Sequence, residues 1–374
     1  MKILLHVSGE IGTKGKNRIK FERKLGENIK KKIENVKIKR AFGSFLIDIN
    51  KKDKEKIKKI PGIAWIAEVL ECKKNLNGLK NAVLKLIKEN NIKEFDIKVN
   101  RSWKGFKYNS QEIRDYLIRE LKNFGLIFKP KSNNIFIEIN KDWFVVFKEK
   151  EKCIGGLPTT MSGKAIILIS GGIDSAVASF LAMRKGLELI FLHFHNYPSN
   201  YTKIIDEKIL KLVKKLNDFQ IESKIYIISF VEAQKEIIKK IHPKYRMMCY
   251  RWLMFKIAEI IAEKENAKVI ITGDSLGQVA SQTLDNISLI IKNSNLPIFM
   301  PLLSFDKAEI IEIAKKIGTY EISIIPYADC CSFMIAKHPA TKIEEKKFLE
   351  LIKNLRIKNI IKKSLNNIRI EKIR

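Results

Sequence analysis

Residues 168–177 read LISGGIDSAV, and the architecture of the C-terminal half can be worked out from this stretch. The apolar run at 165–169, AIILI, is rich in β-branched residues and predicts a buried strand. The segment at 176–186, AVASFLAMRKG, has helical spacing and a glycine at its end. We therefore predict that SGGIDS, at 170–175, is a turn between a strand and a helix.

A turn of this kind can bind an anion. Gly171 and Gly172 allow backbone amides to approach a ligand closely, and the start of the helix adds its positive end. Ser170 and Ser175 add hydroxyl donors, whereas the carboxylate of Asp174 would repel a phosphate unless it holds a cation or caps the helix. The stretch has neither the Gly-Lys-Ser/Thr ending of a Walker motif nor G-x-G-x-x-G spacing, so an ordinary tight turn is the alternative.

Strands and helices alternate after this turn. Apolar strand patterns recur at 188–194, 224–230 and 268–273 with helical patterns between them, which predicts an α/β domain with a parallel sheet. Ligands of such sheets bind outside the carboxyl ends of the strands. Residues 1–50 and 51–154 each have the pattern of an α+β unit, and the final domain is predicted at 155–374, including a basic helical tail.

Composition points to a nucleic-acid partner. The chain has 374 residues and a net charge of +31, with the basic excess concentrated at 1–150 and 351–374. Basic ends suit a polyanion, and a lysine-rich solvated surface is the alternative. No apolar run approaches the roughly 20 residues that cross a bilayer, so we expect a soluble, cytoplasmic protein. Five cysteines make a poor disulfide framework, which favours reduced thiols.

Several motifs together resemble one enzyme family. SGGIDS after a parallel strand resembles the signature of the PP-loop ATP pyrophosphatases. The stretches GEIGTKGKNRIKFERKL (9–25), GGLPTTMSGKAIILISGGIDS (155–175), ITGDSLGQVASQTLDNI (271–287) and PYADCCSFMIAKHPATK (326–342) resemble the tRNA 4-thiouridine synthetases in particular. The resemblance covers nearly the whole chain. It implies a ferredoxin-like domain at 1–50, a THUMP RNA-binding domain at 51–154 and a PP-loop domain, of the adenine nucleotide alpha hydrolase kind, at 155–374.

The resemblance also implies an activity. The family uses ATP and Mg²⁺ to adenylate the C4 oxygen of uridine 8 in tRNA, releasing pyrophosphate, and sulfur then displaces AMP to give 4-thiouridine. A homodimer and a link to thiamine biosynthesis are implied as well. Two alternatives remain open: sulfur transfer to another acceptor, such as a different uridine or a thiazole precursor, and a tRNA-binding protein without catalysis.

By the same resemblance, the ATP site falls on strand ends and on the turn. Its predicted residues are Leu168, Ile169, Ser170, Gly171, Gly172, Asp174, Ser175, His193, Phe194, Arg251, Gly273 and Gln282. From position alone, His193 and Phe194 could equally be core residues, and Arg251 could reach the surface instead of a phosphate. Asp174 is the candidate magnesium ligand. We expect Asp274 to cap the helix that follows it, and a part in holding magnesium is the alternative.

The cysteines at 330 and 331 are the candidates for sulfur transfer. Cys331 fits the register of the family's sulfur-transfer cysteine best, Cys330 is second, and a structural pair is the alternative. We expect no rhodanese domain of the kind that some relatives carry, so sulfur would come from a cysteine desulfurase persulfide or from free sulfide. Some relatives hold an iron–sulfur cluster with a C-x-x-C motif, but this chain has Trp252 where the second cysteine would stand. We therefore do not favour a cluster on Cys249, Cys330 and Cys331.

Two basic clusters in the N-terminal half are candidates for tRNA binding. Their residues are Lys14, Lys16 and Arg18 in the first, and Arg101, Lys104 and Lys107 in the second. Trp103 and Phe106 are interleaved with the second cluster and could stack on bases. The alternatives are a solvated surface for the lysines and a core role for the aromatic residues.

Overall fold

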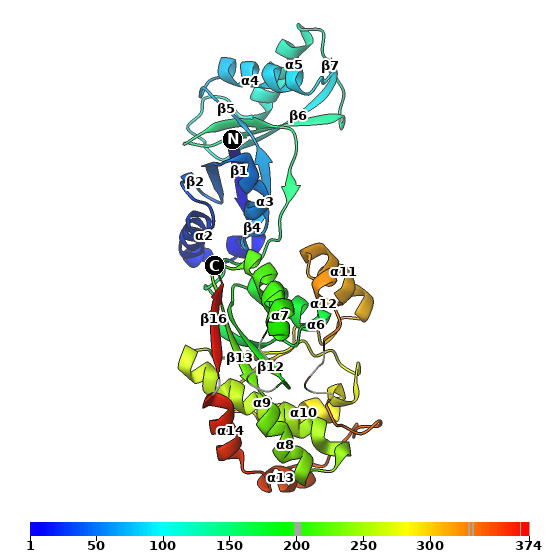
Figure 1. The fold of residues 1–374 in the computed structure, drawn as a ribbon. Coiled ribbons are helices and arrows are strands. Elements are labelled where there is room, and N and C mark those ends of the chain that lie inside the picture. Colours follow the sequence, from blue (N-terminus) through cyan, green and yellow to red (C-terminus); the bar gives the residue numbers. More distant parts are fainter. Residues whose placement is uncertain (198–202, 328–329, 331–332, 367, 374) are drawn as a thin grey trace. The chain divides into compact units, whose positions relative to one another are not determined.

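The computed structural model describes residues 1–374 except 198–202, 328–329, 331–332, 367 and 374. The chain divides into two compact units, Met1–Pro158 and Thr159–Arg374 (Figure 1). The second unit begins four residues after the predicted start at 155. None of the described helices is long and apolar enough to cross a membrane.

The first unit begins with an antiparallel sheet in the order β10-β4-β1-β3-β2. Its strands are β1 (Lys2–Val7), β2 (Lys37–Ala41), β3 (Ser44–Asp48), β4 (Ile63–Glu68) and β10 (Glu151–Lys152). The predicted boundary at residue 50 is wrong, because β4 pairs with β1 and places Ile63 and Ile66 in the same core as Ile3 and Leu5. The short helix α1 (Gly9–Gly12) is followed by the longer α2 (Arg18–Lys32), and α3 (Lys54–Lys58) precedes β4.

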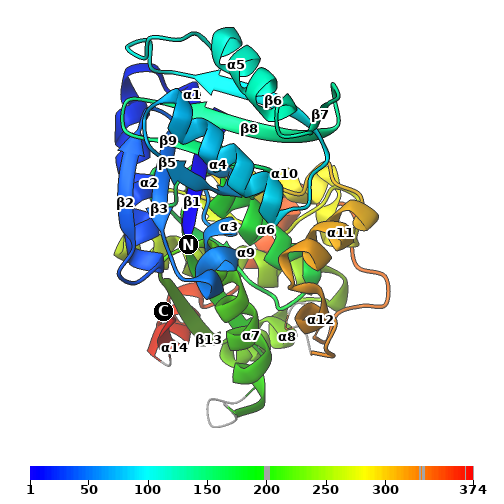
Figure 2. The same ribbon diagram turned by 90° about the horizontal axis from the view of Figure 1, so that it is seen from above.

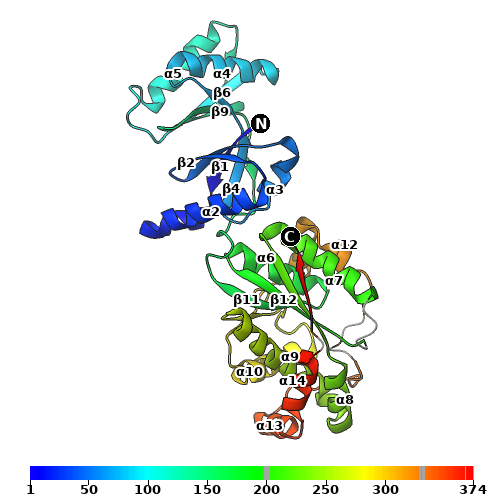
Figure 3. The same cartoon turned by 60° about the vertical axis from the view of Figure 1, so that its left-hand side comes forward.

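A second sheet completes this unit, in the order β5-β9-β8-β6-β7. Its strands are β5 (Leu70–Cys72), β6 (Glu94–Arg101), β7 (Ile127–Phe128), β8 (Asn133–Ile139) and β9 (Phe144–Phe147). The helices α4 (Leu76–Glu89) and α5 (Ser110–Lys122) lie side by side on one face of this sheet (Figures 2 and 3). Buried apolar side chains of both helices, such as Val83 and Leu117, pack against strand residues such as Ile97.

The second unit contains the predicted α/β sheet, in the order β15-β14-β11-β12-β13-β16. Its parallel strands are β11 (Lys164–Leu168), β12 (Glu188–His195), β13 (Ser223–Ser229), β14 (Ile270–Ile271) and β15 (Ile298–Phe299). The predicted helical tail is only partly right. Helices α13 (Glu345–Lys353) and α14 (Ile357–Asn366) are followed by β16 (Arg369–Ile373), which pairs antiparallel with β13.

Helices cover both faces of this sheet (Figures 1 and 3). On one face lie α6 (Ile173–Arg184), α7 (Lys203–Leu216), α11 (Lys307–Ile317) and α12 (Tyr320–Ser323). On the other lie α8 (Val231–Lys240), α9 (Pro243–Glu265), α10 (Leu284–Lys292) and the two tail helices. The long helix α9 is the centre of the second layer, because its buried side chains, including Tyr250 and Leu253, belong to the largest apolar cluster. This arrangement leaves the carboxyl ends of the strands available for a site.

Candidate active site at the end of β11

The predicted turn joins β11 to α6, which begins at Ile173 with Gly172 as its N-cap residue. Gly171 has a φ of +85°, a conformation that favours glycine. The hydroxyl of Ser175 accepts from the Ser170 amide at 3.3 Å and donates to the Gly172 carbonyl at 3.2 Å. The loop is thus held by its own polar groups, and the first amides of α6 lie beside it as donors for an anion.

Gly273, at the exit of β14, lies against this loop. A Cβ atom at position 273 would come within 2.7 Å of the Ser175 amide nitrogen and 2.8 Å of the Asp174 carbonyl carbon. Because both neighbours are backbone atoms, no side-chain rotation can relieve the contact. Glycine at 273 therefore lets two strand exits and the start of α6 meet in one place.

A cavity of about 400 Å³ opens at these strand ends. The predicted site residues in its wall are Leu168, Ile169, Ser170, Asp174, Ser175, Phe194, Arg251, Gly273, Gln282 and Cys330. Gly171, Gly172 and His193 are not in the wall. Apolar side chains from α9, including Met254 and Phe255, complete the lining. The cavity combines an apolar surface suited to a base with polar groups suited to phosphates.

Asp174 has two partners that the sequence analysis did not predict. The ammonium of Lys307 donates to its carboxylate at 2.5 Å, and the side chain of Gln278 donates at 3.1 Å. Lys307 is the first residue of α11, whose N-cap is Asp306. A cation at the positive end of a helix is unfavourable. A lysine directly after a predicted N-cap residue was therefore the sequence signal that could have marked Lys307 as a site residue. Asp174 and Gln278 line the cavity, and Lys307 contacts the cavity wall through its bond to Asp174.

Arg251 and Asp274 form a bidentate ion pair in the cavity wall. The nitrogen–oxygen distances are 2.6 and 3.0 Å, and Thr272 and Gln282 also donate to Asp274. Burial alone would raise the pKa of Asp274, but the Arg251 guanidinium and these hydrogen bonds hold it below its ordinary value. The prediction that Asp274 caps the next helix is wrong, because its side chain is 8% exposed and bonded to Arg251 of α9. Arg251 is thereby fixed at the cavity rather than free to reach the surface.

His193 is buried behind the cavity. Its Nδ1 lies 2.7 Å from the Ile169 carbonyl oxygen and its Nε2 lies 2.7 Å from the Tyr327 hydroxyl. Burial lowers the pKa of His193 to about 4, so the ring is neutral near pH 7. His193 and Phe194 were both predicted to belong to the ATP site. Phe194 lines the cavity, whereas the His193 side chain connects the end of β11 to Tyr327.

The structure separates the cysteines by environment. Cys330 lies in the cavity wall, and its carbonyl oxygen accepts from Gln234 at 2.9 Å. Cys249 is completely buried in the core of α9, and burial raises the pKa of its thiol to about 12. Cys331 lies outside the described residues. Among the residues that the structure describes, no group of three His, Cys, Asp or Glu side chains is arranged to hold a metal ion.

The predicted tRNA-binding residues fall into two classes. Lys16, Lys104 and Lys107 are exposed, and Lys14 is half-buried above the Phe21 ring. Arg18 and Arg101 have structural partners instead: Arg18 pairs with Glu22 at 2.7 Å, and Arg101 donates to the Phe106 carbonyl at 2.9 Å.

The two aromatic residues of the second cluster pack inward. Trp103 and Phe106 both contact Phe144 and lie against the core of the second sheet. The core alternative is therefore right for these two rings. The exposed lysines of the same segment keep the predicted role open.

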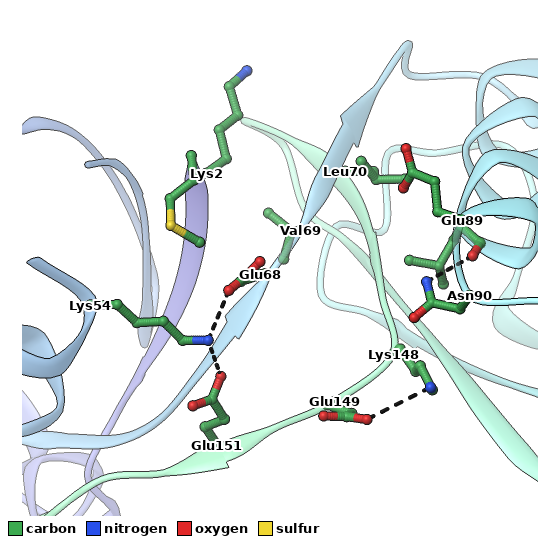
Figure 4. A pocket seen from close by; sticks show the side chains of 12 residues that line it. Lys2, Lys54, Glu68, Val69, Leu70, Glu89, Asn90, Lys148, Glu149 and Glu151 are labelled. Carbon is green, nitrogen blue, oxygen red and sulfur yellow. Dashed lines mark hydrogen bonds and ion pairs between the residues drawn. The ribbon is translucent and has the colours of Figure 1, made fainter. Parts of the chain in front are cut away.

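A larger hollow of about 520 Å³ lies in the first unit, but it contains none of the predicted site residues. Figure 4 shows Lys54 between Glu68 and Glu151, and the lysine nitrogen lies 2.8 and 2.5 Å from the two carboxylates. Lys148 and Glu149 form a further pair beside it. The charged side chains named here form ion pairs with one another. The hollow lies where the two sheets of the first unit are joined.

The fold and the loop define a nucleotide-binding α/β domain of the PP-loop class, which follows a ferredoxin-like domain along the chain. The family described as "Thiamine biosynthesis protein (ThiI)" matches residues 160–357, and the "ThiI ferredoxin-like domain" matches residues 2–67. The chain belongs to the ThiI family. The family and the fold class predicted from the motifs are therefore confirmed.

Individual relatives agree. A protein of Thermoanaerobacter sp. (strain X514) named "Probable tRNA sulfurtransferase" is 37% identical over 358 residues, which cover 93% of this chain and 94% of that protein. A relative of the same name from Oceanobacillus iheyensis is 37% identical over 91% of this chain and 88% of its own length. The crystal structure of a 4-thiouridine synthetase–RNA complex with bound ATP is 34% identical, with a TM-score of 0.90 over the whole of both chains.

Proposed function

We propose that this chain is a cytoplasmic, ATP-dependent tRNA sulfurtransferase that forms 4-thiouridine at position 8 of tRNA. Membership of the ThiI family supports the proposal, as do relatives named for tRNA sulfur transfer and for 4-thiouridine synthesis. The observation that carries it is the cavity at the end of β11, whose wall contains the phosphate-binding loop and Cys330 together. Activation of a base and delivery of sulfur require these two elements in one place.

In the first step, the C4 oxygen of uridine attacks the α-phosphorus of ATP. The new oxygen–phosphorus bond forms as the bond to the bridging oxygen breaks, so that pyrophosphate leaves, and the proton on N3 of the base passes to solvent. Phosphoryl transfer depends mainly on position and on charge stabilisation. The amides at the start of α6 and the ammonium of Lys307 would face the charge on the departing pyrophosphate.

The carboxylates of the cavity wall differ in their capacity to hold Mg²⁺. The oxygens of Asp274 are occupied by Arg251, Thr272 and Gln282. The oxygens of Asp174 also have partners, Lys307 and Gln278, but Asp174 is 24% exposed and both of these bonds lie at the surface, where a cation could replace them. Asp174 is therefore the carboxylate that would hold the ion. When bound, Mg²⁺ neutralises charge on the phosphates.

In the second step, sulfur replaces AMP at C4. With free sulfide, a carbon–sulfur bond forms at C4, the carbon–oxygen bond breaks and AMP leaves without any redox change. With a persulfide, the donor protein first passes its terminal sulfur to a cysteine thiolate. This sulfur then attacks C4, and a second thiol cleaves the remaining sulfur–sulfur bond, becoming part of a disulfide that an external thiol reduces. Cys330 and Cys331 are the proposed carriers.

The first unit would hold the tRNA. Its excess of basic residues supports binding through phosphates, with Lys16, Lys104 and Lys107 as exposed contacts. A homodimer that shares one tRNA between two chains is part of the same proposal.

One assay tests the function. The protein is incubated with unmodified tRNA, ATP, Mg²⁺ and sulfide, and AMP and the near-ultraviolet absorbance of thiolated base are measured. Both products support the proposal. AMP without thiolated base would favour another sulfur acceptor, and neither product would favour a tRNA-binding protein without catalysis.

The carrier cysteine is tested with a persulfide donor in place of sulfide. Cys330→Ser and Cys331→Ser are compared with Cys72→Ser, a cysteine in β5 of the first unit. We expect thiolation to be lost in at least one of the first two and kept in the third. Full activity in both single variants and in the double variant would contradict a carrier role for either cysteine.

A further inference from the structure

A buried lysine holds the segment that precedes the cysteine pair. Lys208, on α7, is 7% exposed, and its ammonium donates to the carbonyl oxygens of Ser323 at 2.9 Å and Ile325 at 2.6 Å. It also lies 5.5 Å from the centre of the Tyr327 ring. Burial lowers the pKa of Lys208. Burying a lysine is unfavourable unless its charge has such partners, so this side chain is committed to the segment Ser323–Tyr327.

Tyr327 also contacts the end of β11 through His193. A carbonyl oxygen only accepts hydrogen bonds, so the bond to Ile169 requires a proton on Nδ1 of His193. Since the ring is neutral, its Nε2 is an acceptor, and the Tyr327 hydroxyl donates to it at 2.7 Å. The chain of bonds runs from Tyr327 through His193 to Ile169, the residue directly before the phosphate-binding loop.

The same helix that carries Lys208 packs against the loop. A Cβ atom at Gly171 would lie 2.8 Å from Cδ1 of Ile209 and 3.7 Å from Cε of Lys208. Helix α7 therefore contacts both the loop and the segment Ser323–Tyr327. Tyr327 stands three residues before Cys330, which lines the cavity.

We propose that Lys208, His193 and Tyr327 form a latch that fixes the segment Ser323–Tyr327, which leads into Cys330 in the cavity wall, and that Lys208 and Tyr327 are positioning residues for sulfur transfer from a cysteine. This inference rests on the proposed function, because it assumes that the cysteine pair carries sulfur. The latch acts on the delivery of sulfur. Of the predicted ATP-site residues only His193 belongs to the latch, and its side chain is not in the cavity wall. The other groups proposed for adenylation are held by β11, α6, β14, α9 and α11, so adenylation should not depend on the Tyr327 hydroxyl or on Lys208.

The test is Tyr327→Phe, which removes one hydroxyl and keeps the ring. Tyr320→Phe is the matched control, because Tyr320 lies in the same region, on α12, and outside the latch. Each protein is assayed with tRNA, ATP and Mg²⁺ for AMP formation, for thiolation from a persulfide donor and for thiolation from free sulfide, which bypasses the cysteine. For Tyr327→Phe we expect about a tenfold loss of persulfide-dependent thiolation, consistent with the loss of one buried hydrogen bond. AMP formation and sulfide-dependent thiolation should stay within about twofold of wild type.

Lys208→Met supplies a second measurement with the same expected pattern and a larger loss. An equal fall of all three activities in Tyr327→Phe would mean that the hydroxyl has only a general structural role, and would overturn the latch. Unchanged persulfide-dependent thiolation in Tyr327→Phe would overturn it as well. Failure of the proposed function is distinguishable, because wild-type protein would then form no thiolated base from either sulfur source.

Discussion

Gly273→Ala tests whether contact between two strand exits builds the site. The added Cβ would lie 2.7 Å from the Ser175 amide nitrogen, whereas ordinary contacts begin at 3.4 Å, so the backbone must move by roughly 0.7 Å. Overpacking of this kind costs about 1–3 kcal/mol. For a unit of this size, the midpoint of thermal unfolding should fall by roughly 2–12 °C. Because the displaced atoms belong to the phosphate-binding loop, AMP formation should fall about 100-fold, the order expected for a misplacement near 1 Å.

The measurements are calorimetry and AMP formation with saturating tRNA. Gly26→Ala is the control, because position 26 lies within α2 and its added Cβ would meet only a ring carbon of Phe45, at an ordinary 3.5 Å. Alanine there should raise stability by about 0.5–1 kcal/mol, since glycine is a poor helix former. If Gly273→Ala kept wild-type AMP formation and stability, the loop would not depend on the exit of β14, and the argument from close packing would fail.

Three further changes probe other parts of the molecule. Lys307→Met should lower AMP formation by about 10- to 100-fold, because a cation at the phosphates is lost. The free energy of unfolding should change by less than about 1 kcal/mol, since the pair with Asp174 is partly exposed. A loss of stability large enough to account for the loss of AMP formation would contradict this role. Asp274→Asn should cost about 3 kcal/mol at pH 7 in urea unfolding, because Arg251 stays buried without its carboxylate. The pKa of Asp274 is lowered from 3.8, so the charged carboxylate stabilises the fold above that pH, and this contribution is lost as the pH falls below it. The difference in free energy of unfolding between wild type and variant should therefore shrink in acid. A difference that did not change with pH would contradict the ion pair. Replacing Lys104 and Lys107 together by Gln should weaken tRNA binding and reduce its salt dependence by about two charges, and an unchanged salt slope in filter binding would place the RNA elsewhere.

The loop and the sheet could be predicted because their signals are local. A β-branched run followed by small residues and a helical pattern determines the strand, the turn and the helix within about twenty residues of sequence, and β11 and α6 lie where this pattern predicts them. The partners of Asp174 are different. Lys307, at the start of α11, and Gln278, in a loop, lie 133 and 104 residues away along the chain, and only the tertiary fold brings them to Asp174.

Each missed element has a physical reason. β16 is a five-residue edge strand whose residues alternate between exposed and half-buried, and it follows directly on two basic amphipathic helices, so its period-two signal is weak. The boundary at residue 50 is wrong for a different reason: β4 joins its sheet by pairing with β1, a long-range contact that no local pattern encodes. The partner of Arg18, Glu22, could not be predicted from charge, and the tRNA-binding role of Arg18 stays a prediction.

The buried polar groups near the cavity divide into two sets with different tasks. Arg251, on α9, is bonded to Asp274, which follows β14, so this pair stiffens the wall that would receive the nucleotide. Lys208 and His193 bond instead to backbone and side-chain atoms of an irregular segment, Ser323–Tyr327, that has few apolar anchors of its own. A buried lysine or imidazole without hydrogen-bond partners is unfavourable. These bonds therefore favour the position of the segment in which both Lys208 and His193 have their partners. The bonds of Lys208 and His193 thus fix the segment that leads into Cys330, the cysteine in the cavity wall, which is the arrangement that the proposed sulfur transfer would need.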